Sequence, residues 1–174
     1  TKTCYDHIVM PLALLLLQRL GMDPKACELF LKVLIAGKYK VKTQHGISSE
    51  TYSTTAENTM HGPGQGGHGS PSIWTIVSTE IMACMEDHGT GMHICSPDGT
   101  DSVTQTMTGF VDDTSNLCND FLNQLDGNNL VTELIANTQE TSQWWEELLY
   151  ATGGKLELPK CFIYLIIWQF DKEG

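Results

Sequence analysis

The chain has 174 residues, enough for one domain with a hydrophobic core, and its 41% hydrophobic and 18% charged residues exclude a disordered protein. The formal net charge of −11 argues against strong unaided binding to nucleic acid, because such binding depends on Lys and Arg side chains that neutralise phosphates. Six cysteines without a C-x-x-C pair favour free thiols in a reducing, intracellular compartment, and the apolar run at residues 8–17 is too short to span a bilayer.

Two helices are predicted at the start of the chain. Residues 8–20 are rich in leucine and end at Gly21, so they are expected to form a buried helix. Asp23 and Pro24 are the residue types of an N-cap and a first helical position, and the helix that they begin is expected to end near Gly37. Its apolar stripe consists of Ala26, Leu29, Phe30, Val33 and Leu34.

A β-hairpin is predicted next. Residues 38–43 alternate between polar, mostly basic, and apolar side chains, which indicates a half-buried strand with a basic face. His45 and Gly46 are the expected turn, and residues 47–55 the expected return strand. The lysines of the basic face are candidates for contact with a nucleic-acid backbone, and a solvated strand face explains them at least as well: Lys38, Lys40 and Lys42.

The centre of the chain combines a glycine-rich loop, a helix and three short strands. Residues 61–69 contain five glycines. Ser70 is expected to be the N-cap and Pro71 the first residue of a helix that ends near Asp87. Strands are expected at residues 92–95, 103–110 and 114–118.

The last third of the chain is predicted to contain one long helix and two strands. Residues 129–150 have an amphipathic pattern that stops at Gly153 and Gly154. Residues 156–158 and 161–170 are predicted strands, and the second is almost wholly apolar, which indicates a buried position. Helices and hairpins in this order indicate a single α+β domain over residues 1–174, in which helices cover one face of an antiparallel sheet.

Two adjacent carboxylates follow the strand predicted at residues 103–110. The sequence Phe110-Val111-Asp112-Asp113 is typical of a β-hairpin that displays both acids at its tip. Adjacent carboxylates repel each other, so such a pair is usually retained where a cation lies between them. Carboxylate oxygens are hard ligands, which select Mg²⁺ or Mn²⁺. The alternative is that the two aspartates only close the hairpin, because Asp is a favoured turn residue.

The glycine-rich loop precedes this turn in an order that a known family shares. Gln65-Gly66, three further residues, Ser70-Pro71 and a helix are followed about forty residues later by Phe-x-Asp-Asp. Glycines let a backbone approach a ligand closely, and a helix start offers free N–H groups. This order resembles the palm domain of reverse transcriptases, especially those of non-LTR retroelements and group II introns.

The resemblance implies a nucleotide-binding role for two segments. Residues 1–6 resemble the end of the first palm motif, in which the aromatic residue, here Tyr5, excludes a ribose 2′-OH. The backbone at Thr3 and Cys4 would face the triphosphate. Gln65 and Gly66 match the motif that packs against the template and the incoming nucleotide.

The same resemblance implies a metal site and a proton donor. Asp112, with Asp113 beside it, would hold catalytic Mg²⁺ or Mn²⁺ for two-metal nucleotidyl transfer. Lys160, in a segment similar to the fourth palm motif, would protonate the leaving pyrophosphate. The metal-binding Asp of the first motif would precede Thr1, and residues 168–174 would begin the primer grip. The chain is therefore expected to be a partial palm, without fingers or thumb and poorly active alone.

The function that this resemblance predicts is that of an RNA-directed DNA polymerase from a retrotransposon-like element, with an RNA template, a DNA primer and dNTPs as partners and no membrane. Two alternatives are a decayed, non-catalytic palm that acts as a scaffold and an RNA-dependent RNA polymerase palm. Intact Asp112 and Asp113 argue against long decay. RNA-dependent RNA polymerases typically carry Gly-Asp-Asp, and Tyr5 at the gate position favours deoxynucleotides.

Two further patterns allow more than one interpretation. A feasible tetrahedral zinc set, whose spacing fits no common zinc module, consists of Cys84, His88, His93 and Cys95. Trp144 and Trp145 offer rings that stack on a base, but their helical spacing with Leu148 and Leu149 favours a core position for at least one of them.

Overall fold

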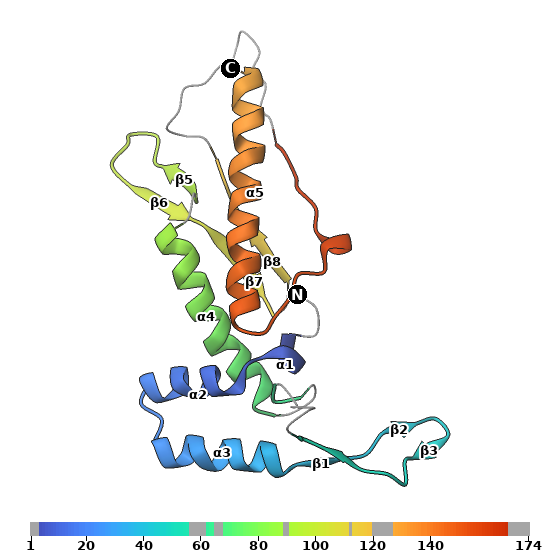
Figure 1. The fold of residues 1–174 in the computed structure, drawn as a ribbon. Helices are drawn as coiled ribbons and strands as arrows, with labels where there is room; N and C mark the ends of the chain where they lie inside the picture. Colours follow the sequence, from blue (N-terminus) through green and yellow to red (C-terminus); the bar gives the residue numbers. More distant parts are fainter. Residues whose placement is uncertain are drawn as a thin grey trace.

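The computed structural model describes residues 4–55, 62–64, 68–88, 91–111, 113–119 and 127–166. Figure 1 shows the order of the helices and strands along the chain. The helices are α1 (Cys4–His7), α2 (Met10–Arg19), α3 (Pro24–Ala36), α4 (Ser70–His88) and α5 (Gly127–Ala151), and a 3₁₀ turn, η1, covers Leu158–Lys160. The strands are β1 (Lys38–Tyr39), β2 (Lys42–Thr43), β3 (Gly46–Ile47), β4 (Tyr52–Ser53), β5 (Met92–Cys95), β6 (Ser102–Gln105), β7 (Met107–Phe110) and β8 (Asp113–Asn116).

The first two long helices end where the sequence predicts, but α2 begins at Met10, two residues later than predicted, and is buried only at Met10, Ala13 and Leu14. Helix α2 stops before Gly21, which has a φ of +99° that suits a residue without a Cβ. Helix α3 follows Asp23, whose carboxylate accepts hydrogen bonds from the backbone amides of Lys25 at 2.7 Å and Ala26 at 3.4 Å. The predicted N-cap is therefore confirmed.

Helix α4 begins near the predicted residue, but Ser70 does not cap it. The Ser70 hydroxyl donates a hydrogen bond to the carbonyl of Gly64 at 2.8 Å. The carbonyl of Gly69 accepts a helical hydrogen bond from the amide of Ile73 at 3.0 Å, so Gly69 occupies the capping position. The N-cap prediction for Ser70 is wrong because its side chain holds the preceding glycine segment instead.

The predicted apolar stripe of α3 is only partly buried. The buried residue of this helix is Cys27, which packs against α2 and whose thiol lies 3.7 Å from the carbonyl oxygen of Leu14. Leu29 and Val33 are exposed, at 63% and 62% of their surface. Helical periodicity locates an apolar face, but the helix that covers it decides which edge of that face is buried.

Antiparallel pairing confirms the α+β class, although the described strands form four two-stranded sheets instead of one. β1 pairs with β4 and β2 with β3, as two ladders of one long hairpin that projects from the helices (Figure 1). This hairpin is mostly exposed, not half-buried as predicted. The strand predicted at residues 103–110 is interrupted at the buried Thr106, whose carbonyl accepts a hydrogen bond from the amide of Leu117 at 2.8 Å.

The hydrophobic core lies where α4 meets α2 and α5, as Figure 1 shows. Trp145 is 2% exposed and belongs to the core, whereas Trp144 is 39% exposed and stacks on His88 with ring centroids 4.6 Å apart. The core residues of the three helices are Met10, Ala13, Leu14, Ile73, Trp74, Val77, Ile81, Met85, Trp145 and Leu149. Within the described ranges, every helix is too short or too polar to cross a membrane.

Residues 161–166 are not the buried strand that the sequence predicts. They have no regular secondary structure, and Phe162, Tyr164 and Ile166 are exposed at 76%, 84% and 71% of their surface. Residues 156–158 also lie outside a strand, and Leu158 begins η1. An apolar run indicates a strand from composition alone, whereas burial of that strand depends on a neighbour that pairs with it.

Candidate functional site

The predicted hairpin is present as β7–β8, but Asp113, expected at its tip, is the first residue of β8. Phe110 pairs with Asp113, so Val111 and Asp112 form a two-residue connection. Val111 has a φ of +56°, in the left-handed region that a β-branched residue rarely adopts. Two-residue hairpin turns favour this backbone because its twist matches that of the strands. Asp113 is exposed at the start of β8, and Asp112 lies outside the described residues.

Helix α4 holds this hairpin through two contacts. The indole Nε1 of Trp74, a residue only 4% exposed, donates a hydrogen bond to the backbone carbonyl of Val111. Gly109 lies against the side chain of Met82, because a Cβ at position 109 would overlap the terminal methyl group of Met82. Helix α5 also contacts β8. Two helices therefore contact the described residues on both sides of Asp112.

The glycine-rich segment lies against α1. Gly62 has a φ of +79°, and a Cβ at this position would overlap the backbone carbonyl of Tyr5. Tyr5 is half-buried and packs against the core. Two residues further along, Gly64 accepts the hydrogen bond from Ser70 at the start of α4. The segment thus lies between the helix that carries Tyr5 and the first turn of α4.

Parts of three predicted motifs therefore contact α4, two of them through residues of its N-terminal half. Ser70 binds the glycine segment, Trp74 binds the hairpin tip, and α1 contacts the same helix. Ser70 and Trp74 are four residues apart, so they lie on one face of α4, one turn from each other. Segments that are distant in the sequence become neighbours through this one helix face.

The structure describes only some of the other residues that the resemblance assigns to the site. Thr3, Gln65 and Gly66 lie outside the described residues, as Asp112 does. Cys4 is the first residue of α1. Lys160 is the last residue of η1, after α5, and its side chain is exposed.

The described side chains do not by themselves form a metal site. Within the described ranges, no three His, Cys, Asp or Glu side chains come together. A two-metal site at Asp113 therefore needs Asp112 and a further acid from outside these ranges. The four zinc candidates are also not assembled as a set: His88 stacks on Trp144, whereas the Nε2 atom of His93 lies 3.2 Å from the Sγ atom of Cys95.

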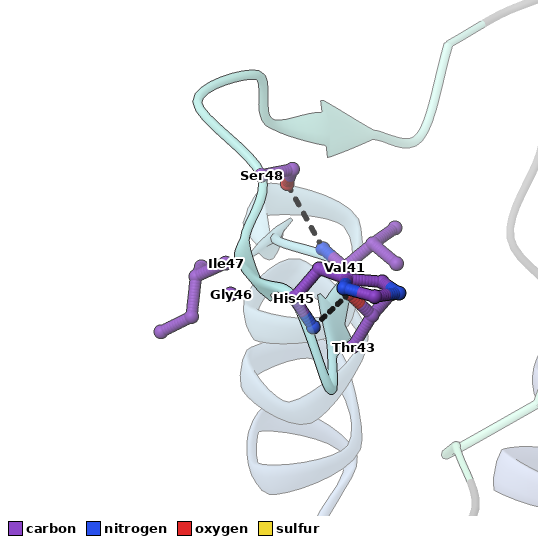
Figure 2. Close-up of a pocket in the computed structure, with 6 residues that line it drawn as sticks. All are labelled: Val41, Thr43, His45, Gly46, Ile47 and Ser48. Carbon is purple, nitrogen blue, oxygen red and sulfur yellow. Dashed lines mark hydrogen bonds between the residues drawn. The ribbon is translucent and has the colours of Figure 1, made fainter.

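A surface hollow of about 260 Å³ lies at the β2–β3 turn (Figure 2). The amide of Val41 donates to the hydroxyl of Ser48 at 3.1 Å, and the amide of His45 donates to that of Thr43 at 3.1 Å, so these hydroxyl groups already stabilise the turn. Figure 2 shows the side chain of Ile47 pointing away from them. The hollow is lined by neighbouring residues of one exposed hairpin and includes none of the predicted site residues: Val41, Thr43, His45, Gly46, Ile47 and Ser48.

Sequence reasoning missed Trp74 and Ser70 as the residues that join the motifs. A tryptophan on an apolar helix face predicts burial, and nothing in the sequence predicts the carbonyl that its N–H will reach. Gly109 did carry a signal, because a glycine inside a strand often marks a close approach by another part of the chain. No protein-family model, curated protein or solved structure matches the chain significantly.

Proposed function

We propose that this chain is part of the palm of an RNA-directed DNA polymerase of the retroelement type, in which the β7–β8 tip contributes to a two-metal site for nucleotidyl transfer. The observation that supports it most is the meeting of three motifs at α4: the glycine segment at Ser70, the acidic turn at Trp74, and α1 with Tyr5. The order of these motifs in the sequence suggested the family. Their contacts in space are an independent reason to treat them as one site.

In this proposal the residues of the chain position the reactants and select dNTPs against NTPs. Asp112 and Asp113 would hold Mg²⁺ or Mn²⁺, which would supply charge stabilisation during nucleotidyl transfer to the primer. The Trp74 hydrogen bond holds the carbonyl of Val111, the residue that precedes Asp112 in the sequence. Tyr5 selects dNTPs against NTPs beside the glycine segment, and Lys160 gives a proton to the leaving pyrophosphate.

Primer extension with either nucleotide set separates the candidate functions. The protein expressed from its complete reading frame is supplied with an RNA template, a DNA primer and Mg²⁺, and then with dNTPs or with NTPs. The proposal predicts extension with dNTPs. Extension with NTPs alone would indicate an RNA-dependent RNA polymerase. Failure with both sets, by a folded protein, would favour the non-catalytic scaffold.

The variant Tyr5→Ala tests the selection step. Removing a ring that excludes the 2′-OH is expected to raise the use of NTPs relative to dNTPs by about tenfold, the size of effect that one pocket contact typically has on discrimination. Tyr39→Ala is the matched control, because Tyr39 stacks on Tyr52 in the projecting hairpin. An unchanged ratio in Tyr5→Ala would remove Tyr5 from the nucleotide site.

A further inference from the structure

A thiol and an imidazole lie side by side on β5, away from the acidic turn. The Sγ atom of Cys95 is 3.2 Å from the Nε2 atom of His93, within hydrogen-bonding distance, and both residues are half-buried. The two residues are separated by one position in the strand, so their side chains point to the same side of the hairpin. Cys95 is a free thiol.

The imidazole ring of His93 is held in place from the neighbouring strand. Its Nδ1 atom lies 3.0 Å from the hydroxyl of Thr104, the residue directly opposite in the β5–β6 register. When the Nδ1–H group donates to that hydroxyl, the Nε2 atom carries the lone pair that faces the thiol of Cys95. Thr104 therefore holds the orientation of the ring, and the Nδ1–H tautomer is the one that suits acceptance of a proton from sulfur.

The backbone of His93 is fixed as well. The side-chain carbonyl of Asn119 accepts a hydrogen bond from the amide of His93 at 2.8 Å, and the side-chain amide of Asn119 donates to the carbonyl of His93 at 2.8 Å. These two bonds join β5 to the segment that follows β8. The imidazole thus stands on a strand held from both sides, by β6 and by Asn119.

The thiols of Cys27 and Cys161 lie near carbonyl groups instead of an imidazole. Cys27 is buried and lies near a backbone carbonyl, and Cys118 lies 3.8 Å from the hydroxyl of Thr141. Cys84 and Cys161 are more exposed than Cys95, and the thiol of Cys161 lies 3.6 Å from the carbonyl of Glu157. A carbonyl group, such as those near Cys27 and Cys161, is not a base toward a thiol, whereas an adjacent neutral imidazole is.

We propose that Cys95 is a site of thiol–disulfide exchange with low-molecular-weight disulfides such as glutathione disulfide, and that His93 is its proton acceptor. The thiol proton passes to the Nε2 atom of His93, and the sulfur of Cys95 forms a bond to one sulfur of the incoming disulfide. The bond between the two sulfurs of that disulfide breaks, and the leaving thiolate takes the proton from His93. Cys95 is oxidised to a mixed disulfide, and one thiol is released.

This site is separate from the proposed polymerase site. Cys95 pairs with Ser102 at one end of the β6–β7 run, whereas Phe110 lies at the other end, next to the acidic turn (Figure 1). Exchange at Cys95 needs neither metal nor nucleotide. A failure of the polymerase proposal therefore leaves this one standing, and the reverse also holds.

The test is the rate at which each cysteine of the whole protein is modified by glutathione disulfide at pH 7, followed by peptide mass spectrometry. We expect Cys95 to be modified first, although Cys84 and Cys161 are more exposed. His93→Gln is expected to slow modification of Cys95 by about tenfold, because the thiol then lacks its proton acceptor. His88→Gln is the matched control and is expected to leave that rate unchanged.

Two results would overturn the proposal. One is faster modification of Cys84 and Cys161 than of Cys95 in the unmutated protein, which would show that exposure alone sets the order. The other is an unchanged rate for Cys95 in a folded His93→Gln variant, as judged by its circular dichroism. The first comparison needs no substitution, so a variant that does not fold still leaves a decisive result.

Discussion

The indole nitrogen of Trp74 donates a hydrogen bond to the backbone carbonyl of Val111, and this bond connects a buried helix to the residue that precedes Asp112. Trp74 is part of the core, so its ring has little freedom to move. The carbonyl of Val111 is therefore bonded to a side chain of the hydrophobic core. A carboxylate that ligates a catalytic metal needs a backbone held in this way.

The substitution Trp74→Phe removes this hydrogen bond and leaves space in the core. We expect the free energy of unfolding to fall by about 1–3 kcal/mol, which combines a lost hydrogen bond with imperfect packing. Urea denaturation measures the change. Trp144→Phe is the control, because Trp144 is partly exposed, and it is expected to change stability by about 0.5 kcal/mol or less. Equal losses in the two variants would contradict a special role for the bond to Val111.

Val111 holds a strained backbone that a different residue would adopt more easily. With φ at +56°, a β-branched side chain is unfavourable, whereas Asn is common at this position of two-residue hairpin turns. Val111→Asn is expected to raise the free energy of unfolding by about 1 kcal/mol. Val103→Asn in β6 is the control, since Val103 is similarly exposed but lies in a regular strand, where Asn is disfavoured. Thermal melts of both variants should move in opposite directions. A lower melting temperature for Val111→Asn would show that the turn is not strained.

Two glycines allow the contact between the loop and α1 to be measured apart from backbone strain. Gly62 and Gly64 both have a φ of +79°, but a Cβ at Gly64 meets no atom within 4 Å, whereas one at Gly62 overlaps the carbonyl of Tyr5. Gly64→Ala therefore reports the cost of the backbone angle alone, about 1 kcal/mol. Gly62→Ala is expected to cost clearly more, because α1 has to move. Urea denaturation of the two variants gives the difference. Equal losses would mean that α1 and the loop are not packed as described.

Local chemistry explains why the helices were predictable and several strand assignments were not. Asp23 caps α3 with its own side chain, and Gly21 ends α2, so both ends were visible in the sequence. The burial of residues 161–166 was predicted from their apolar character alone. Phe162 and Tyr164 are instead exposed, because burial depends on a neighbouring strand that no pattern within the segment specifies.

In the candidate site, too, some features were predictable from the sequence and others were not. A hairpin at this position followed from the turn chemistry and the flanking strands, and it was predicted, but Asp113 was expected at the tip and is instead paired with Phe110 in β8. The left-handed backbone of Val111 was not predicted, because a β-branched residue disfavours this conformation. The contact found at this residue is the hydrogen bond from Trp74, which is distant in the sequence. Ser70 was assigned to capping, yet its hydroxyl joins the glycine segment to α4. Neither the short-range bond of Ser70 nor the long-range bond of Trp74 leaves a periodic signal in the sequence.

The turn between β5 and β6 gives a prediction about pH. The hydroxyl of Ser96 and then the hydroxyl and amide of Thr100 donate hydrogen bonds to Asp98, and they lower the pKa of its carboxyl group because they stabilise the charged form. The folded-state pKa lies below the unfolded value of about 3.9, so the stabilisation is complete above that pH and is lost as the pH falls through the folded-state pKa.

Carbon-detected NMR titration of Asp98 checks this prediction. We expect a midpoint below that of the same residue in a short unstructured peptide. Ser96→Ala is expected to move the midpoint back toward the peptide value, since Ser96 provides the largest of the three contributions. A midpoint for the unmutated protein that equals the peptide value would contradict the described hydrogen bonds.

The most direct test of the polymerase proposal is Mg²⁺-dependent primer extension by the protein from its complete reading frame, with and without the substitution Asp112→Asn. We predict that Asp112→Asn lowers the rate of primer extension at least about a hundredfold, because a bound metal stabilises the transition state by several kcal/mol. The same substitution is predicted to leave the unfolding midpoint unchanged. Asp101→Asn, in the β5–β6 turn, is predicted to extend the primer at the unmutated rate. Extension by Asp112→Asn at the unmutated rate would contradict the proposal that this turn holds the catalytic metal.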